Sequence, residues 1–130
     1  MPTVLLVDDS ETMRGIVRLL LAPLGPDYRC VEASSAHRAM ALVRLMLPDV
    51  ILADVLMPGM DGVQLVEALR AEPRPEVRRI PVVLLTASQD VELETRGLAA
   101  GAHSVLRKPI APEPLVAAIR GALGAPEVRA

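Results

Sequence analysis

Short runs of apolar residues recur five times along the chain, and each run predicts a β-strand. The runs are mostly continuous, as in VLLV, VILA and VVLL, and do not alternate with polar residues. Continuous apolar runs of this length are typical of strands that are buried on both faces, as in a parallel sheet covered by helices. The expected strands cover residues 3–7, 29–33, 50–54, 81–86 and 104–107.

Helical periodicity fills the segments between these strands. Apolar residues recur there at intervals of three or four, which places them on one face of a helix. Pro23 and Pro48 mark the ends of the first two helices, Ser35 is expected to cap the second, and the Pro- and Arg-rich stretch 72–79 is expected to be a loop. Helices are expected at residues 11–22, 36–46, 62–71, 91–100 and 112–123.

A strand followed by a helix, repeated five times, predicts the α/β fold class. The expected architecture is (βα)₅, a doubly wound five-stranded parallel sheet with helices on both faces. Residues 1–123 are expected to form this single domain, and residues 124–130 a short C-terminal tail without an output domain. Ligands of such sheets bind beyond the carboxyl ends of the strands, so the residues at those ends are the first candidates for a functional site.

The overall composition excludes several classes of protein. The 130 residues carry a formal net charge of −2, and Tyr28 is the only Phe, Tyr or Trp, which argues against a basic or base-stacking nucleic-acid module. No apolar run is long enough to span a membrane, and the N-terminus lacks the features of a signal peptide. We therefore expect a cytoplasmic protein without direct contact to nucleic acid or membrane.

Polar side chains stand at the carboxyl ends of four of the five expected strands. Asp8 and Asp9 follow the first strand, Asp54 ends the third, Thr86 ends the fourth, and Lys108 follows the fifth. Three carboxylates at one edge repel one another, and a hard divalent cation such as Mg²⁺ compensates that repulsion. Lys108 is the only Lys among 14 basic residues, which indicates a role for a compact ammonium group.

The same residues have the chemistry that phosphoryl transfer requires. That reaction needs a nucleophile, a cation at the phosphoryl oxygens and fixed positive charge. Asp54 is the candidate nucleophile and would form an aspartyl phosphate. Asp8 and Asp9 are candidates to hold the metal, Lys108 to pair with the phosphoryl oxygens, and Thr86 to donate a hydrogen bond.

Four motifs, each at a strand end, resemble the receiver domain of two-component response regulators. The resemblance covers roughly residues 3–122 and implies a flavodoxin-like fold with strand order 2-1-3-4-5. The motifs are LLVDDS (5–10), DVLMPGMDG (54–62), LLTA (84–87) and KP (108–109).

The resemblance implies a phosphoacceptor and a set of metal ligands. Asp54 would be the phosphoacceptor. Asp8 and Asp9 would form the acidic pair that binds Mg²⁺, or Mn²⁺ in its place, together with Asp54 and the backbone carbonyl of Leu56. The metal would therefore be held by side chains from two strands and by one peptide group.

The resemblance also assigns roles to four residues around this set. Thr86 would be the switch hydroxyl and Lys108 the phosphate-pairing lysine. Pro109 would follow a cis Lys–Pro bond, and Gly62 would open the third helix. These roles connect the strand ends to the loops that follow them.

The sequence departs from the family at Val105. Receiver domains commonly carry Tyr or Phe three residues before the lysine, and that ring moves into the space that the switch hydroxyl vacates. Val105 has no ring and its χ1 is restricted. We therefore expect activation to depend on backbone movement of residues 86–91 and 105–110 rather than on rotation of a ring.

As a receiver, the chain is expected to accept a phosphoryl group from a phosphohistidine and then to switch a protein-interaction face. The expected donor is a sensor histidine kinase or a histidine phosphotransfer domain that docks on the first helix and the loop after the fifth strand. The downstream partner is a protein of unknown identity. We expect a monomer or a phosphorylation-dependent dimer, and a signalling protein that only assists its own phosphorylation and dephosphorylation rather than an enzyme.

Two alternatives are kept beside this interpretation. A phosphorylation-independent interaction module on the same fold would tolerate the loss of an acid, of Thr86 or of Lys108, but all of them are present. A flavin-binding protein would need a phosphate loop rich in Ser, Thr and Gly after the first strand, where this chain has Asp8 and Asp9.

Overall fold

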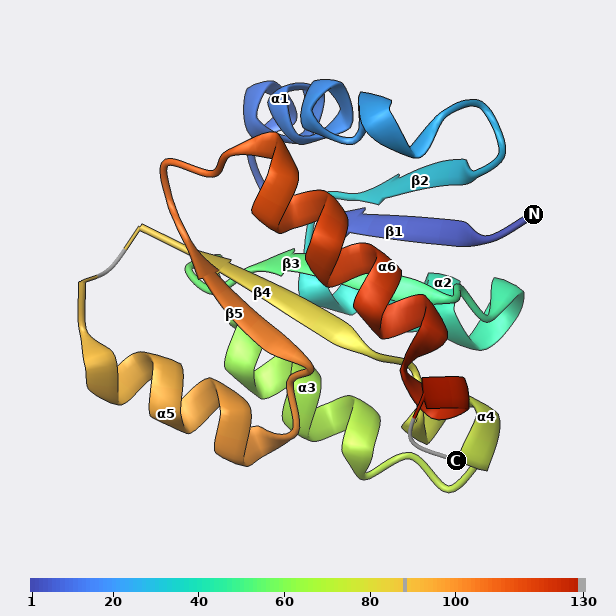
Figure 1. Ribbon diagram of the computed structural model, residues 1–130. Helices are drawn as coiled ribbons and strands as arrows, with labels where there is room; N and C mark the ends of the chain where they lie inside the picture. The colour runs from blue at the N-terminus through green and yellow to red at the C-terminus, as the bar shows by residue number, and fades with distance from the viewer. Residues whose placement is uncertain (88, 129–130) are drawn as a thin grey trace.

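The computed structural model of the protein describes residues 1–87 and 89–128. Five strands of the described chain form one parallel sheet in the order β2-β1-β3-β4-β5, which confirms the expected fold class and strand order (Figure 1). The observed strands match the expected ones, except that β4 begins one residue later. They are β1 (Thr3–Val7), β2 (Arg29–Ala33), β3 (Val50–Asp54), β4 (Val82–Thr86) and β5 (Ser104–Arg107).

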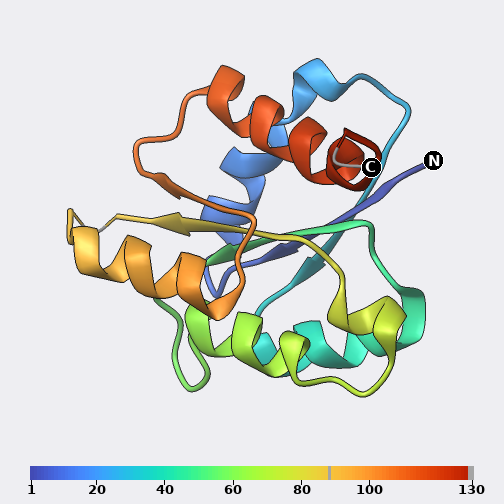
Figure 2. The same cartoon turned by 60° about the horizontal axis from the view of Figure 1, so that its bottom comes forward.

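Helices cover both faces of the sheet, so the molecule has three layers (Figures 1 and 2). On one face lie α1 (Glu11–Leu20) and α6 (Pro112–Val128). On the other face lie α2 (Ala36–Met46), α3 (Gly62–Arg70) and α5 (Val91–Ala100). This is the doubly wound arrangement that the alternation of strands and helices predicts.

The alternation of side chains along each strand divides the core into two apolar clusters. Leu5 and Leu84 belong to the cluster under α2, α3 and α5, whereas Leu6 and Leu85 belong to the cluster under α1 and α6. Each fully buried leucine stabilises the fold by about 1.5–3 kcal/mol relative to an exposed one. Because both faces of the central strands are covered, their interior positions are all apolar, which explains the continuous runs in the sequence.

Prolines produce two short helical turns that the sequence patterns do not predict. The expected helix over residues 11–22 ends at Leu20, and a 3₁₀ turn, η1 (Ala22–Leu24), follows because Pro23 has no N–H for a further α-helical hydrogen bond. The stretch 72–79 contains α4 (Pro75–Arg78), whose first residue has the fixed φ of an initial helical turn. The prediction of a simple loop is therefore wrong for these four residues.

The last helix is longer than the expected 112–123, because α6 continues to Val128. Gly124 lies inside the helix, and a single glycine costs only about 1 kcal/mol there relative to alanine. Buried Leu115 and Ile119 hold the helix against the sheet on its N-terminal side. Most of the expected tail is thus helical, and residues 129–130 of it lie outside the described residues.

Capping side chains begin four helices at the carboxyl edge of the sheet, among them α5 at Asp90. The side chains of Ser10 and Ser35 each accept a 3.1 Å hydrogen bond from a backbone N–H in the first turn of α1 and α2. Asp61 and Gln64 form a reciprocal capping box at α3, with hydrogen bonds of 2.8 and 2.9 Å. Each cap stabilises its helix by about 1 kcal/mol, so the loops at this edge are held at both ends.

Candidate functional site

The parallel register brings four strand ends together at one edge of the sheet. Asp8 and Asp54 follow paired residues of β1 and β3, and they are therefore neighbours. Thr86 lies one residue beyond the partner of Asp54 on β4. The carbonyl of Thr86 accepts a 2.7 Å hydrogen bond from the backbone N–H of Lys108, which follows β5. The predicted site residues thus converge from strands that are far apart in the sequence.

Three carboxylates form a cluster at this edge. Asp8, Asp9 and Asp54 each have a carboxylate oxygen within 4.8 Å of those of the other two. Asp8 is buried, Asp54 is half-buried and Asp9 is exposed. Burial, above all, raises the pKa of Asp8; a hydrogen bond from the backbone N–H of Ser10 opposes this, and the negative charge of Asp54 adds to it. The cluster therefore holds negative charge at an energetic cost.

Lys108 is the cation that faces the cluster. Its Nζ lies 3.2 Å from Oδ1 of Asp54, and the two side chains are only 19% and 13% exposed. The peptide bond between Lys108 and Pro109 is cis, as the resemblance implies. One ammonium group opposes three carboxylates, so the site keeps an excess of negative charge.

The donor set fits a hard divalent cation. Carboxylate oxygens are the ligands that Mg²⁺ prefers, and the ion keeps several waters in an octahedral shell. A charge of +2 would neutralise the excess that Lys108 leaves, and the exposure of Asp9 keeps one side of the cluster open to solvent. Leu56, whose backbone carbonyl is the remaining predicted ligand, lies in the loop after Asp54, and its side chain is exposed.

Gly62 brings the loop after β3 back against the site. A Cβ at Gly62 would lie 2.5 Å from the carbonyl oxygen of Asp54 and 2.9 Å from Cα of Val55. The N–H of Gly62 donates a 2.9 Å hydrogen bond to the carbonyl of Val55. Gly62 is the first residue of α3, as predicted, and only glycine fits there without displacing the backbone beside Asp54.

The two predicted switch positions lie on neighbouring strands. Thr86 is buried at the end of β4. Val105, on β5, packs against the apolar cluster under α5. A Cβ at Gly97 of α5 would lie 3.0 Å from the Leu84 side chain and 3.2 Å from Cγ2 of Val105. The helix therefore packs closely on Val105, and little room is left between β5 and α5.

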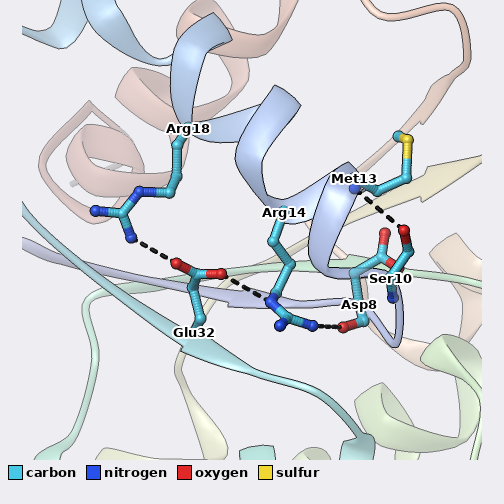
Figure 3. A network of polar contacts seen from close by, with 6 residues as sticks. All are labelled: Asp8, Ser10, Met13, Arg14, Arg18 and Glu32. Atoms are coloured by element: carbon cyan, nitrogen blue, oxygen red, sulfur yellow. Dashed lines mark hydrogen bonds and ion pairs between the residues drawn. The ribbon is translucent and has the colours of Figure 1, made fainter.

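Contacts from α1 and β2 hold Asp8 in place, and Figure 3 shows the contact from Arg14 of α1. Its N–H donates a 3.1 Å hydrogen bond to the carbonyl of Ala33, and its Oδ1 accepts one of 2.9 Å from the N–H of Ser10. Its own carbonyl accepts a hydrogen bond from Nη1 of Arg14. The backbone donor, the backbone acceptor and the carboxylate of Asp8 are thus all engaged.

Residues 4–120 match the family model of the response regulator receiver domain. The chain belongs to this family. The match includes every predicted site residue, from Asp8 to Pro109. The resemblance found in the sequence motifs is thereby confirmed.

Curated relatives and solved structures agree with this assignment. The chain is 34% identical over 122 residues to the phosphate regulon transcriptional regulatory protein PhoB of Pseudomonas aeruginosa, covering 93% of this chain and 51% of PhoB. It is 42% identical over 118 residues to the response regulator PleD of Caulobacter vibrioides, covering 90% of this chain and 25% of PleD. The chain thus spans about half of the length of PhoB and a quarter of that of PleD.

The fold is shared with the chemotaxis response regulator CheY4 of Vibrio cholerae. The two structures superpose with a TM-score of 0.82 at 34% identity, covering 95% of this chain and 99% of CheY4. Receiver domains are signalling domains of two-component systems that interact with histidine kinases or other phosphodonors, and they bind Mg²⁺ through acidic residues. Of the helices in the described ranges, none has the length and apolar character to cross a membrane.

Two polar residues of the receiver site were not among the predicted site residues. Ser10 has the signature of a helix N-cap, which could have indicated its place beside Asp8. Arg14 has no such signature, because its partner at the site is a backbone carbonyl and every residue has one.

Proposed function

We propose that this receiver accepts a phosphoryl group on Asp54 from a phosphohistidine donor in a Mg²⁺-dependent reaction, and then switches a protein-interaction face. One observation carries the proposal: Oδ1 of Asp54 lies 3.2 Å from Lys108 Nζ, and a carboxylate oxygen of Asp54 lies within 4.8 Å of those of Asp8 and Asp9. A fixed positive charge and a cation site, both next to Asp54, can neutralise the phosphoryl oxygens while Asp54 attacks phosphorus.

In the proposed reaction, a carboxylate oxygen of Asp54 forms a bond to phosphorus. The bond between phosphorus and the donor's imidazole nitrogen breaks, its electron pair stays on that nitrogen, and the ring takes up a proton from solvent. Lys108 exchanges its contact with Asp54 for one with a phosphoryl oxygen. The hydroxyl group of Thr86 donates a hydrogen bond to another phosphoryl oxygen. The product is an acyl phosphate on the receiver and a free imidazole on the donor.

The proposed metal ligands are Asp8, Asp9, Asp54 and the backbone carbonyl of Leu56. When bound, Mg²⁺ or Mn²⁺ neutralises charge on the phosphoryl oxygens. Asp9 is exposed and keeps the site accessible to water and to the donor. The same access lets water attack the acyl phosphate, so the receiver assists its own dephosphorylation as well as its phosphorylation.

The proposed docking face for the donor is an apolar groove beside Lys108. The groove has a volume of about 450 Å³, and Ile16 on α1, at its rim, is 44% exposed. An apolar groove next to the phosphoacceptor suits the helical surface of a phosphohistidine-bearing domain, since helices bind such grooves through an apolar face. The groove is lined by Met13, Ile16, Val17, Leu20, Lys108, Pro109 and Ile110.

In the proposed switch, Thr86 moves toward the phosphoryl group, and the backbone of residues 86–91 and 105–110 moves with it. Residue 88 of the first segment lies outside the described residues. The tight packing of Val105 against α5 supports a backbone route, because the valine side chain has little space in which to change rotamer. The altered surface would then bind a downstream protein in the cytoplasm, with the receiver as a monomer or a dimer.

Intact mass measurement tests the phosphoacceptor. Incubation of the chain with acetyl phosphate and Mg²⁺ should add one phosphoryl group, and incubation with a phosphorylated histidine phosphotransfer domain should do the same. Asp54→Asn should abolish both, and chelation of the metal should abolish labelling of the wild type. Asp27→Asn, which changes an exposed acid away from the site, is the matched control. Undiminished labelling of Asp54→Asn would refute Asp54 as the phosphoacceptor, whereas no labelling of the wild type by either donor would favour a phosphorylation-independent module.

A further inference from the structure

Arg14, in the first turn of α1, connects this helix to two strands (Figure 3). Its Nε donates a 2.7 Å hydrogen bond to Oε1 of Glu32 on β2, and its Nη1 donates to the carbonyl oxygen of Asp8 at the end of β1. The side chain of Arg14 is only 14% exposed. A charged group this deeply placed, with two directed hydrogen bonds, has a defined position because the planar guanidinium fixes both donors at once.

We propose that Arg14 is a positioning residue for the divalent-cation site, which it serves through the backbone carbonyl of Asp8. The inference rests on the proposed function of the same acidic cluster. The carbonyl that Arg14 holds belongs to the peptide group between Asp8 and Asp9, and this group is planar. The hydrogen bond therefore orients the carbonyl group of Asp8 and, through the same peptide plane, the N–H and Cα of Asp9.

The exposure of Asp9 makes this contact important for the metal. Asp8 is buried and is also held by Ala33 and Ser10, whereas Asp9 lies at the surface. Mg²⁺ requires nearly octahedral geometry, so ligands that are oriented before the ion arrives bind it more tightly. Groups that orient metal ligands without touching the metal commonly change its affinity by about 10–100-fold.

Arg18 provides a control within the same ion network. Its Nη1 donates a 2.7 Å hydrogen bond to Oε2 of Glu32, but it makes no hydrogen bond to Asp8 within the described part of the chain, and its side chain is 47% exposed (Figure 3). Removal of either arginine takes one positive charge away from the neighbourhood of the site. By charge alone, both removals would strengthen binding of a cation. Only removal of Arg14 also frees the Asp8 carbonyl.

The test is the affinity of the full chain for Mg²⁺, measured by isothermal titration calorimetry, because a protein with no Trp and a single Tyr gives little fluorescence signal. Electron paramagnetic resonance of added Mn²⁺ is the second readout. We expect Arg14→Ala to weaken Mg²⁺ binding about tenfold, and Arg18→Ala to leave it unchanged or slightly tighter. Arg14→Lys and Arg18→Lys form a second pair that keeps the charge. Only Arg14→Lys should bind Mg²⁺ more weakly, because lysine lacks the fork that reaches two acceptors.

Phosphorylation by acetyl phosphate at increasing Mg²⁺ separates positioning from a general loss of structure. Arg14→Lys should require more Mg²⁺ for half of its maximal rate and still reach the maximal rate of the wild type. If Arg14→Ala does not fold, the lysine pair decides. Equal Mg²⁺ affinities for matched Arg14 and Arg18 variants would overturn the inference and leave the proposed function intact, as long as the wild type binds Mg²⁺ and Asp9→Asn does not. Failure of the wild type to bind Mg²⁺ would overturn both.

Discussion

Arg70 and Gly101 join the C-terminal ends of α3 and α5: Nε and Nη2 of Arg70 donate hydrogen bonds of 3.2 and 2.9 Å to the carbonyl oxygen of Gly101. Nη1 of Arg70 also donates to the carbonyls of Arg78 and Ile80, at 2.8 Å each. One half-buried guanidinium thus holds three backbone carbonyls. These contacts lie at the end of α3 that is opposite Gly62 and the acidic cluster, so their loss should affect stability and leave the chemistry intact.

Arg70→Ala should lower the free energy of unfolding by about 2–4 kcal/mol, because three carbonyls lose their donor at once. Urea denaturation followed by far-ultraviolet circular dichroism measures the change. Arg96→Ala, at an exposed position of α5, is the matched control and should have little effect. Phosphorylation of the folded Arg70→Ala protein by acetyl phosphate should remain at the wild-type level. Equal stability of the two variants would contradict the structural role of Arg70.

Gly62→Ala should destabilise the protein by about 1–3 kcal/mol, because the added Cβ displaces the backbone of Asp54 or α3. It should also slow phosphorylation by acetyl phosphate, since the displaced backbone carries the phosphoacceptor. Gly15→Ala is the opposite case: its Cβ would meet no atom of the described residues within 4 Å. That variant should stabilise α1 by about 0.5–1 kcal/mol. Thermal denaturation of both variants checks the two signs.

Lys108→Arg should slow phosphorylation by acetyl phosphate about tenfold or more, although the charge is unchanged. The compact ammonium of Lys108 lies 3.2 Å from Asp54 in a mostly buried site, and the larger planar guanidinium would have to displace neighbouring groups to make the same contact. Intact mass spectrometry at short times gives the rate. Arg107→Lys, at the neighbouring residue on β5, should leave the rate unchanged. A wild-type rate for Lys108→Arg would show that only the charge matters.

Glu32 should stabilise the fold at neutral pH and lose this effect in acid. Hydrogen bonds from Arg14, and then from Arg18, lower the pKa of Glu32 below its ordinary value of 4.5. Since the folded state favours the ionised form, the stabilisation is present above that ordinary value and disappears as the pH falls through the lowered pKa. Because the side chain is 32% exposed, the contribution is small, about 0.5–1 kcal/mol at low salt.

Urea denaturation of the wild type and of Glu32→Gln at a series of pH values measures this contribution. The variant should be less stable at pH 7, and the two curves should converge at low pH, where both side chains are neutral. High salt should reduce the difference at pH 7. A constant difference at all pH values would mean that the carboxylate charge has no role.

Activation should displace the backbone of residues 86–91 and 105–110. Crystals of the protein with and without a beryllofluoride mimic of the phosphoryl group would reveal the displacement. Similar backbone positions in the two states would contradict the expectation. Val105→Phe adds an independent check: the ring has little space under α5, so the variant should be about 1–3 kcal/mol less stable than the wild type.

Much of the acidic cluster and its lysine could be predicted because both the residue types and their positions at strand ends point to one site. Asp8, Asp54 and Lys108 each end or follow an apolar run, and parallel strands bring such positions to one edge. The order of the strands came from the resemblance to receiver domains. Local periodicity contains no information on which strands pair, since pairing depends on packing between distant segments.

Several features of the structure could not be predicted from the sequence, and each has a physical reason. Arg14 and Arg70 act on backbone carbonyls, and a carbonyl acceptor leaves no mark in the sequence. The short helix α4 begins at Pro75, a residue type that occurs both in loops and in first helical turns, so its identity alone does not decide. Gly124 is ambiguous in a similar way. A glycine near an expected helix end can terminate the helix, but it can also lie within it, as Gly124 does in α6.

The division of the core into two clusters has an evolutionary consequence for β4. Leu84 packs into one cluster and Leu85 into the other, and Thr86 follows them directly. Any displacement of this strand end therefore changes the packing of both apolar clusters, one on each side of the sheet. A substitution that improves binding on one surface therefore changes which side chains pack well on the opposite face. Residues of α1 and α5 should covary across related receivers, although the sheet separates the two helices.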